Sequence, residues 1–276
     1  NNHLISEAAG LYTAGLFLSN HPMALSWRRT GWQVFHQAIQ DQIAPDGTYT
    51  QHSINYHRLM LELSLWMKSL ADWSGDVFPN ISLSLLSAAV RWLVSMADPS
   101  TGLAPNLGSN DGAHFLPLSV CSFFDFRPTI QAASCAFLET AVLPSGPWDE
   151  LGIWLGFPQI QNEVPLIPAS SVHVINGEQS RGYLRAVNFT SRPNQADQLH
   201  VDLWYKGYPI TLDAGTYRYT SPLPWNNSLA GTLCHNTASV DEMDQMYRAG
   251  KFLWLRWAQA KLLETPDQST LVAETD

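Results

Sequence analysis

The spacing of apolar residues changes once along this chain, near residue 150, and this change limits the folds available to it. Before that point, apolar residues recur three and four positions apart, as in amphipathic helices. After it, they alternate with polar residues in short runs, as in β-strands. Helices followed by strands indicate an α+β protein or two domains. We predict a helical domain over residues 1–150 and a strand domain over residues 151–276.

Segments rich in Gly, Pro, Asn and Asp separate five predicted helices in the first half. These helices are HLISEAAGLYTAGLFLS, ALSWRRTGWQVFHQAIQDQI, NYHRLMLELSLWMKSLADWS, ISLSLLSAAVRWLVSMAD and PTIQAASCAFLETAVL. Successive helices with short polar loops are typical of a bundle, solenoid or toroid. The predicted strands are SSVHVING, RGYLRAVNFTS, LHVDLWYKG, YPITLDAGTYRY, HNTASVDEMDQ and FLWLRWAQAKLLE. A tight hairpin turn is predicted around Gly207.

The composition excludes several classes of protein. A hydrophobic content of 45% with 14% charged residues is typical of a well-packed globular protein. The formal net charge of -9 argues against binding to nucleic acid, which needs clustered Lys and Arg. No apolar run reaches the roughly 18 residues of a membrane span. Three cysteines without CxxC spacing indicate neither a disulfide framework nor a zinc knuckle. The chain starts without Met and stops directly after a strand-like run, so we expect an internal fragment of a longer protein.

Two groups of polar residues in the helical half have the composition of functional sites. Asn2 and His3 lie one helical turn from Glu7, although residues of these types also cap helices. Tyr56 and His57 fall in the first turn of a predicted helix, where the helix dipole favours negative charge. This position could support a tyrosinate, and a packed core aromatic is the alternative.

Two further groups follow. Asp111 and His114 lie in the Gly- and Asn-rich loop PNLGSNDGAHF, which is either a ligand-binding loop or a set of tight turns. His200, Asp213 and His235 come from separate predicted strands. Two imidazoles and a carboxylate are a plausible zinc ligand set.

The segment around His200 also makes a prediction about strand orientation. Gln198, His200 and Asp202 share one face of a strand because side chains two apart point the same way. Val201 and Leu203 share the opposite face. We interpret the polar face as the wall of a site and the apolar face as part of the core.

Five segments together resemble a known family. NNHLISEAAGLYTAGLF, DGTYTQHSINYHRLMLEL, GSNDGAHFLPL, LHVDLWYKGYPITLDAGTYRY and CHNTASVDEMDQ occur in the order expected of the heparinase II/III-like polysaccharide lyases, which include alginate and heparin lyases. The resemblance implies an incomplete α/α toroid followed by an antiparallel β-sandwich, with substrate bound in a cleft between them. It also implies that the first toroid helices and the end of the sandwich are missing.

The resemblance further implies a chemistry. Members of this family cleave the bond next to a uronic acid by β-elimination, which needs a neutralised carboxylate, a base and an acid. By resemblance, Asn2 and His3 hold the substrate carboxylate and Tyr56 is the acid and, in many relatives, the base. His200, Asp213 and His235 then correspond to ligands of a structural Zn2+.

Two positions depart from the family pattern. Gln198 stands where relatives carry a catalytic histidine, and an amide cannot transfer a proton near neutral pH. Tyr56 and His3 would then have to carry out the proton transfers. Gln51 stands where many relatives carry Glu. We expect substrate contacts from four residues: Gln51, His57, Asp111 and Gln198.

The leading hypothesis from the sequence is therefore a carbon–oxygen lyase acting on an anionic polysaccharide, in the periplasm or outside the cell. A protein that binds or assembles surface glycans on the same scaffold without catalysis is the second. The third is a glycoside hydrolase, which needs two acidic residues facing one cleft, such as Asp111 and Glu7.

Overall fold

The computed structural model describes residues 1–158, 160, 173–263 and 270–276, and the chain forms two compact units. The first unit comprises Asn1–Thr50, His57–Ser95 and His114–Ala169. The second comprises Gln51–Tyr56, Met96–Ala113 and Ser170–Asp276. Two segments of the helical half thus belong to the unit that contains the strands. The domain boundary near residue 150 stays a prediction.

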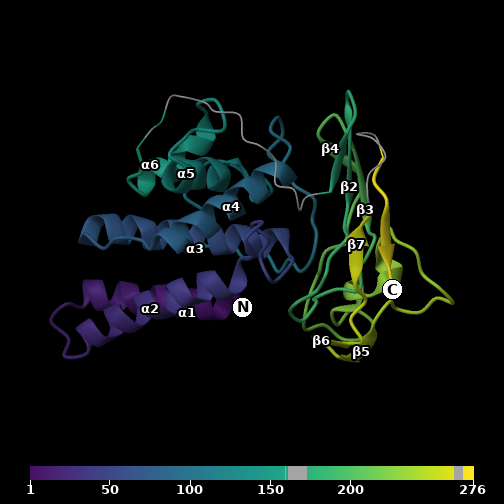
Figure 1. Cartoon of the computed structure of the whole chain (residues 1–276), viewed down its shortest axis with the longest axis horizontal. Coiled ribbons are helices and arrows are strands. Elements are labelled where there is room, and N and C mark those ends of the chain that lie inside the picture. The colour runs from purple at the N-terminus through teal and green to yellow at the C-terminus, as the bar shows by residue number, and fades with distance from the viewer. Residues whose placement is uncertain (159, 161–172, 264–269) are drawn as a thin grey trace. The chain divides into compact units, whose positions relative to one another are not determined.

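The helices occupy the first part of the chain, as the periodicity predicts (Figure 1). They are α1 (Asn2–Phe17), α2 (Ala24–Gln42), α3 (Ile54–Ser74), α4 (Asn80–Met96), α5 (Arg127–Leu138) and α6 (Glu150–Trp154). The first five confirm the predicted helices, and the short α6 was not predicted. Helix α5 ends earlier than predicted because Glu139 adopts a left-handed conformation with φ 53°. No helix of the described residues is long and apolar enough to cross a membrane.

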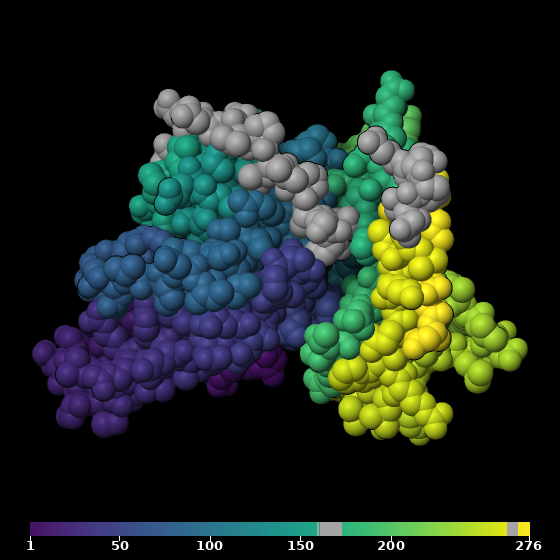
Figure 2. Space-filling model, viewed as in Figure 1, coloured from purple at the N-terminus to yellow at the C-terminus, as the bar shows by residue number. Residues whose placement is uncertain are grey.

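Small residues and polar contacts fix how the helices of the first unit pack. A Cβ on Gly15 or Gly31 would clash with backbone of the facing helix, so α1 and α2 approach closely at these two positions. The indole N–H of Trp66 on α3 donates to Thr13 Oγ1 on α1 at 2.9 Å. In the space-filling view, the blue atoms of α3 lie against the purple and indigo atoms of the α1–α2 pair (Figure 2).

A buried carboxylate on α3 binds the loop before α5 and helix α5 itself, all within the first unit. Glu62 is fully buried, and its Oε2 accepts the backbone N–H groups of Phe115 and Leu116 at 2.9 and 3.1 Å. Its Oε1 accepts the Thr129 hydroxyl of α5 at 3.1 Å. Every one of these donors would be left unsatisfied without the carboxylate, so we assign Glu62 a structural role.

The strands of the described residues are all antiparallel. They are β1 (Val174–Asn176), β2 (Ser180–Leu184), β3 (Val201–Tyr205), β4 (Tyr208–Thr211), β5 (Tyr247–Gly250), β6 (Leu253–Leu255), β7 (Ala260–Leu262) and β8 (Ala273–Thr275). One sheet has the order β1-β2-β3-β4, and β5-β6 and β7-β8 form two further pairs. Helices followed by antiparallel strands agree with the predicted α+β class. Closure into a toroid and a sandwich stays a prediction.

The local strand predictions met mixed outcomes. The hairpin around Gly207 is confirmed: Tyr205 pairs with Tyr208, and both Lys206 and Gly207 have positive φ, as a two-residue turn requires. The prediction of a strand in HNTASVDEMDQ is wrong, because this segment has only an isolated bridge between Val240 and Met243. Part of SSVHVING, residues 170–172, lies outside the described residues.

The two faces of β3 are the reverse of the prediction. Asp202 and Trp204 point into the unit and are buried, whereas Leu203 and Tyr205 are 50% and 49% exposed. On this buried face, His200 Nε2 lies 2.8 Å from Asp202 Oδ1, and Trp204 packs edge-on against Tyr183 of β2. The polar face is therefore interior, and the apolar one is on the surface.

Candidate functional site

The start of helix α3 holds Tyr56 in a fixed place. Ser53 caps the helix, since its Oγ accepts the backbone N–H of Tyr56 at 3.1 Å. The same Oγ donates to the Ser109 carbonyl at 2.5 Å, and the Ile54 N–H donates to the Leu107 carbonyl at 3.0 Å. Gly108 has φ +76°, and a Cβ there would clash with the His52 carbonyl. The 107–109 segment is thus fastened directly to the helix start.

A second loop of the same unit closes on this segment. The Thr216 Oγ1 accepts the Asn110 N–H at 2.8 Å. Gly215 has φ +70°, and a Cβ at this position would clash with the Asn106 amide. These contacts join the loop after β4 to the loop that carries Asp111.

Three segments distant in sequence meet at the Tyr56 phenol as a result. Its O–H donates to Asp111 Oδ2 at 2.9 Å, and its oxygen lies 3.0 Å from the Tyr219 hydroxyl. Tyr56 is 7% exposed, whereas Asp111 is exposed. Burial, then Tyr219, then Asp111 raise the pKa of Tyr56 above its ordinary value of 10. The phenol is therefore protonated at neutral pH.

The predicted metal ligands also come together in the second unit. His200, Asp213 and His235 are buried, and one donor atom of each lies within 4.8 Å of the others. His235 Nδ1 is 3.2 Å from Asp213 Oδ2. Neither His235 ring nitrogen nor Asp213 Oδ2 has a hydrogen-bond partner in the described part of the chain. Buried polar atoms of this kind are rare without a ligand or proton to satisfy them.

The charges around these residues fit a cation. Asp197, Asp202 and Asp213 are each 0% exposed, and a single guanidinium, that of Arg185, pairs with Asp197 at 2.8 Å. The surplus of buried carboxylate calls for positive charge from a metal ion or from a proton on an imidazole. Burial lowers the pKa of His235, but Asp213 and Asp197 outweigh burial and the net shift is upward.

Both ring nitrogens of His200 have partners in the structure. Its Nε2 lies 2.8 Å from Asp202 Oδ1, the arrangement that orients a metal-binding imidazole. Its Nδ1 accepts the Asn236 N–H at 3.1 Å and is therefore unprotonated. A metal bound through Nδ1 would replace that hydrogen bond. Two imidazoles and a carboxylate are ligand types that zinc accepts, and occupation by zinc stays a prediction.

Asn2 and His3 lie in the first unit, at the start of α1. His3 is exposed and Asn2 is half-buried, and Asn1 caps the helix by accepting the Leu4 N–H at 3.3 Å. Their accessibility is compatible with binding a carboxylate. A role in catalysis stays a prediction.

His57 is a core residue, which argues against its predicted contact with substrate. It is 1% exposed, its Nε2 lies 2.9 Å from the Ala89 carbonyl, and its ring stacks on Trp92. Burial lowers its pKa to about 4, so the imidazole is neutral at pH 7. Gln51 is half-buried, with its carbonyl accepting the Asn194 amide at 2.8 Å, and its substrate contact stays a prediction.

Gln198 occupies an interior position, contrary to the predicted wall of a site. It is 0% exposed. Its amide nitrogen donates to the Val187 and Ala258 carbonyls at 2.6 and 2.9 Å, and its Oε1 accepts the Val187 N–H at 3.0 Å. Contact with substrate would require the amide to leave all three backbone partners. The structure indicates that Gln198 bridges two backbone segments.

Replacing Gln198 should therefore cost stability. We expect Gln198→Ala to lower the free energy of unfolding by about 3 kcal/mol, because three backbone groups, two of them part-buried and one buried, lose their partner. Urea unfolding measures the change, and Gln179→Ala, at an exposed position in the same unit, is the control. A Gln198→His variant that folds normally and gains rate would contradict this structural role.

Sequence reasoning missed Tyr219, Asp197 and Arg185. Tyr219 ends the quoted segment YPITLDAGTYRY, but nothing in its spacing distinguishes it from the neighbouring Tyr217. Only the contact of two loops shows which tyrosine reaches Tyr56.

Comparison with known proteins agrees with this arrangement. The sequence profile described as "Heparinase II/III N-terminus" matches residues 1–115, and that described as "Heparinase II/III-like, C-terminal" matches residues 164–276. The chain belongs to the heparinase II/III-like family. The two matches follow each other in the order that the resemblance predicted.

Curated members of the family include two heparin-sulfate lyases. That of Bacteroides thetaiotaomicron is 39% identical over an alignment of 273 positions, and the match covers 91% of this chain and 38% of the relative. That of Bacteroides stercoris is 21% identical and covers 97% of this chain and 40% of the relative. The chain thus spans about two fifths of the length of these relatives.

Solved structures share the fold. A heparinase III crystal structure matches 97% of this chain with a TM-score of 0.70 at 18% identity, and the chain covers 41% of it. A heparan sulfate lyase from Pedobacter heparinus matches with a TM-score of 0.63 at 18% identity, with coverage of 97% and 40%. At 18% identity, this structural likeness supports a shared fold and says nothing about the activity of this chain.

Proposed function

We propose that this protein is a carbon–oxygen lyase that cleaves a uronic-acid-containing polysaccharide by β-elimination. The observation that carries the proposal is the cluster of Tyr56, Asp111 and Tyr219, in which two phenols meet the carboxylate of the exposed Asp111. Membership of a family that includes heparin-sulfate lyases supports a sulfated or carboxylated glycan as the substrate.

The reaction sets the requirements for the residues. The proton on the carbon next to the uronate carboxylate leaves, a carbon–carbon double bond forms, and the bond to the departing oxygen breaks. That oxygen then takes a proton. The acid must hold its proton near neutral pH, and the base must be placed to receive one.

Tyr56 meets the first requirement in its resting state, because burial and its neighbours raise its pKa. It meets the second requirement if its own proton moves to Asp111, which already accepts the hydrogen bond, while the phenol oxygen takes the carbon-bound proton. Tyr56 then gives that proton to the departing oxygen, and Asp111 returns the phenolic proton to Tyr56, which restores both groups. In this scheme Asp111 acts through Tyr56, and the predicted substrate contact of Asp111 is not needed.

Other parts of the site rest on the family resemblance. We propose that Asn2 and His3 neutralise the substrate carboxylate. A Zn2+ ion, when bound by His200, Asp213 and His235, would supply a structural crosslink between segments of the second unit. Action on extracellular polysaccharide would place the protein in the periplasm or outside the cell.

A non-catalytic glycan-binding protein on the same scaffold is the second candidate. The observation in its favour is Gln198, which replaces the family histidine and whose amide is committed to backbone groups. In that case the Tyr56 cluster would bind glycan without turnover.

Incubation of the full-length protein with heparan sulfate, heparin, hyaluronan and alginate separates these candidates. We expect ultraviolet absorbance from the unsaturated product together with new reducing ends on at least one glycan. Reducing ends without this absorbance would indicate hydrolysis. Absence of both signals, with glycan still bound, would establish the binding function instead.

A further inference from the structure

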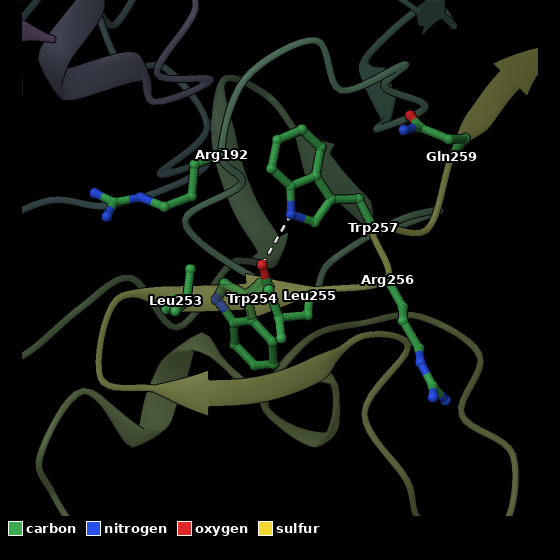
Figure 3. A pocket seen from close by; sticks show the side chains of 7 residues that line it. All are labelled: Arg192, Leu253, Trp254, Leu255, Arg256, Trp257 and Gln259. Atoms are coloured by element: carbon green, nitrogen blue, oxygen red, sulfur yellow. Dashed lines mark hydrogen bonds between the residues drawn. The ribbon is translucent and has the colours of Figure 1, made fainter.

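A shallow depression on the second unit has an apolar floor and two cationic sides (Figure 3). It is lined by residues of β6 and of the segment that follows it, together with one residue from before β3: Arg192, Leu253, Trp254, Leu255, Arg256, Trp257 and Gln259. None of these residues belongs to the Tyr56 cluster or to the predicted metal ligands.

Trp257 is held rigidly within this depression. Its indole N–H donates to the Trp254 carbonyl at 2.9 Å, the contact drawn in Figure 3. It packs against the core cluster that contains Trp254 and Phe189 but is only partly buried. A fixed aromatic surface loses little conformational entropy when a ligand stacks on it.

The two arginines leave positive charge unsatisfied beside this surface. Arg192 and Arg256 are exposed, and neither has an acidic partner among the residues that the structure describes. Their side chains extend in different directions on either side of Trp257 (Figure 3). The chain as a whole carries 24 acidic and 15 basic side chains, so two unpaired guanidinium groups around one tryptophan are not a general property of its surface.

The depression is also connected to the candidate catalytic cluster within the same unit. The ring of Tyr219 contacts the ring of Phe252 with centroids 5.2 Å apart. Phe252 directly precedes Leu253, which lines the depression. A chain-like ligand could therefore reach from one to the other along this part of the second unit.

We propose that this depression is an accessory binding site for an anionic oligosaccharide. A sugar ring stacks on Trp257, and sulfate or carboxylate groups on neighbouring sugars bind Arg192 and Arg256. Guanidinium groups are suited to this because they donate paired hydrogen bonds to planar or tetrahedral oxyanions. The identity of the glycan rests on the proposed function, whereas the presence of a site for anions does not.

The test measures binding in a background without turnover. In the full-length protein carrying Tyr56→Phe, we expect Arg192→Gln with Arg256→Asn to weaken binding of a heparan sulfate dodecasaccharide by about tenfold or more, measured by titration calorimetry. Asparagine is chosen at position 256 because Arg256 has φ 55°, a conformation that asparagine tolerates. Trp257→Phe should weaken binding by a smaller factor, since it keeps an aromatic ring but loses the indole.

A matched control removes the same charge elsewhere. Arg29→Gln with Arg91→Gln changes two exposed arginines on α2 and α4 and should leave the affinity within about twofold. Equal losses in both double variants would overturn the site, because they would reflect net charge alone. An unchanged affinity in the Arg192/Arg256 variant would overturn it as well.

Two further ligands separate this inference from the proposed function. Polyglutamate bound as tightly as heparan sulfate, with the same dependence on Arg192 and Arg256, would overturn the assignment to a glycan. Site-dependent heparan sulfate binding by a protein that releases no unsaturated product from any glycan would support the accessory site and overturn the lyase proposal. Lyase activity, together with heparan sulfate binding that does not depend on Arg192 and Arg256, would support the lyase proposal and overturn the accessory site.

Discussion

Tyr56→Phe is expected to abolish formation of unsaturated product, with a loss of at least about 10²- to 10⁴-fold, the usual contribution of a positioned acid or base. The variant keeps the ring that fills the site and loses only the hydroxyl that contacts Asp111 and Tyr219. Because Asp111 is exposed and can be solvated instead, we expect the free energy of unfolding to change by only about 1 kcal/mol. Product absorbance and urea unfolding measure the two effects.

Tyr205→Phe is the matched control for this change. Tyr205 belongs to the same unit, is exposed, and donates its hydroxyl to Gln179 at 2.9 Å, away from the cluster. It should keep full turnover. The wild-type rate should also show no limb from phenol ionisation below about pH 10, because burial, Tyr219 and Asp111 raise the pKa of Tyr56. Retained turnover in Tyr56→Phe would remove this residue from the mechanism.

The second large effect concerns the three buried ligands. We expect His235→Ala to lower the melting temperature by about 10 °C, because it leaves Asp213 buried without a positive partner or a shared metal ion. Chelation of the natively purified protein should lower the melting temperature in the same direction. The rate measured well below the melting temperature should fall much less than the stability does, if the metal is structural.

Metal analysis completes this experiment. About one zinc per chain is expected in wild type and a strong reduction in His235→Ala. His21→Ala, at an exposed position on the first unit, should leave the zinc content unchanged and shift the melting temperature much less, because it loses only a stack on Trp27 and one exposed hydrogen bond. Natively purified wild-type protein without zinc, and with a melting temperature that does not respond to chelation, would contradict the assignment.

The helical half was predictable because its signals are local. Apolar residues at three- and four-residue spacing have to face one direction on a helix, and each predicted helix is present. Two errors remained: Glu139 stops α5 early by adopting a left-handed conformation, and the short helix α6 was not predicted. The strand half was harder, since period-two alternation does not show which face is buried, and the faces of β3 were predicted in reverse.

Some site residues were also predicted from the sequence, and others were not. The motif order identified Tyr56, Asp111 and the His200, Asp213 and His235 set, and the structure brings these together in two groups within one unit. His57 and Gln198 were expected to contact substrate, yet the structure places both in the interior. Adjacency in sequence to a functional residue does not determine which way a side chain points, because burial of neighbouring surfaces decides that.

By itself, the sequence determined the order of helices and strands, the hairpin at Gly207, and the family, because these depend on periodicity, turn chemistry and motif order. Only the tertiary structure decided that Tyr219 is the partner of Tyr56 and that Gln198 bridges backbone groups. It alone also gathered Arg192, Arg256 and Trp257 around one depression. The physical reason is that these arrangements depend on loops far apart in the chain. Such loops meet through specific hydrogen bonds and close backbone approach, and neither leaves a periodic signal in the sequence.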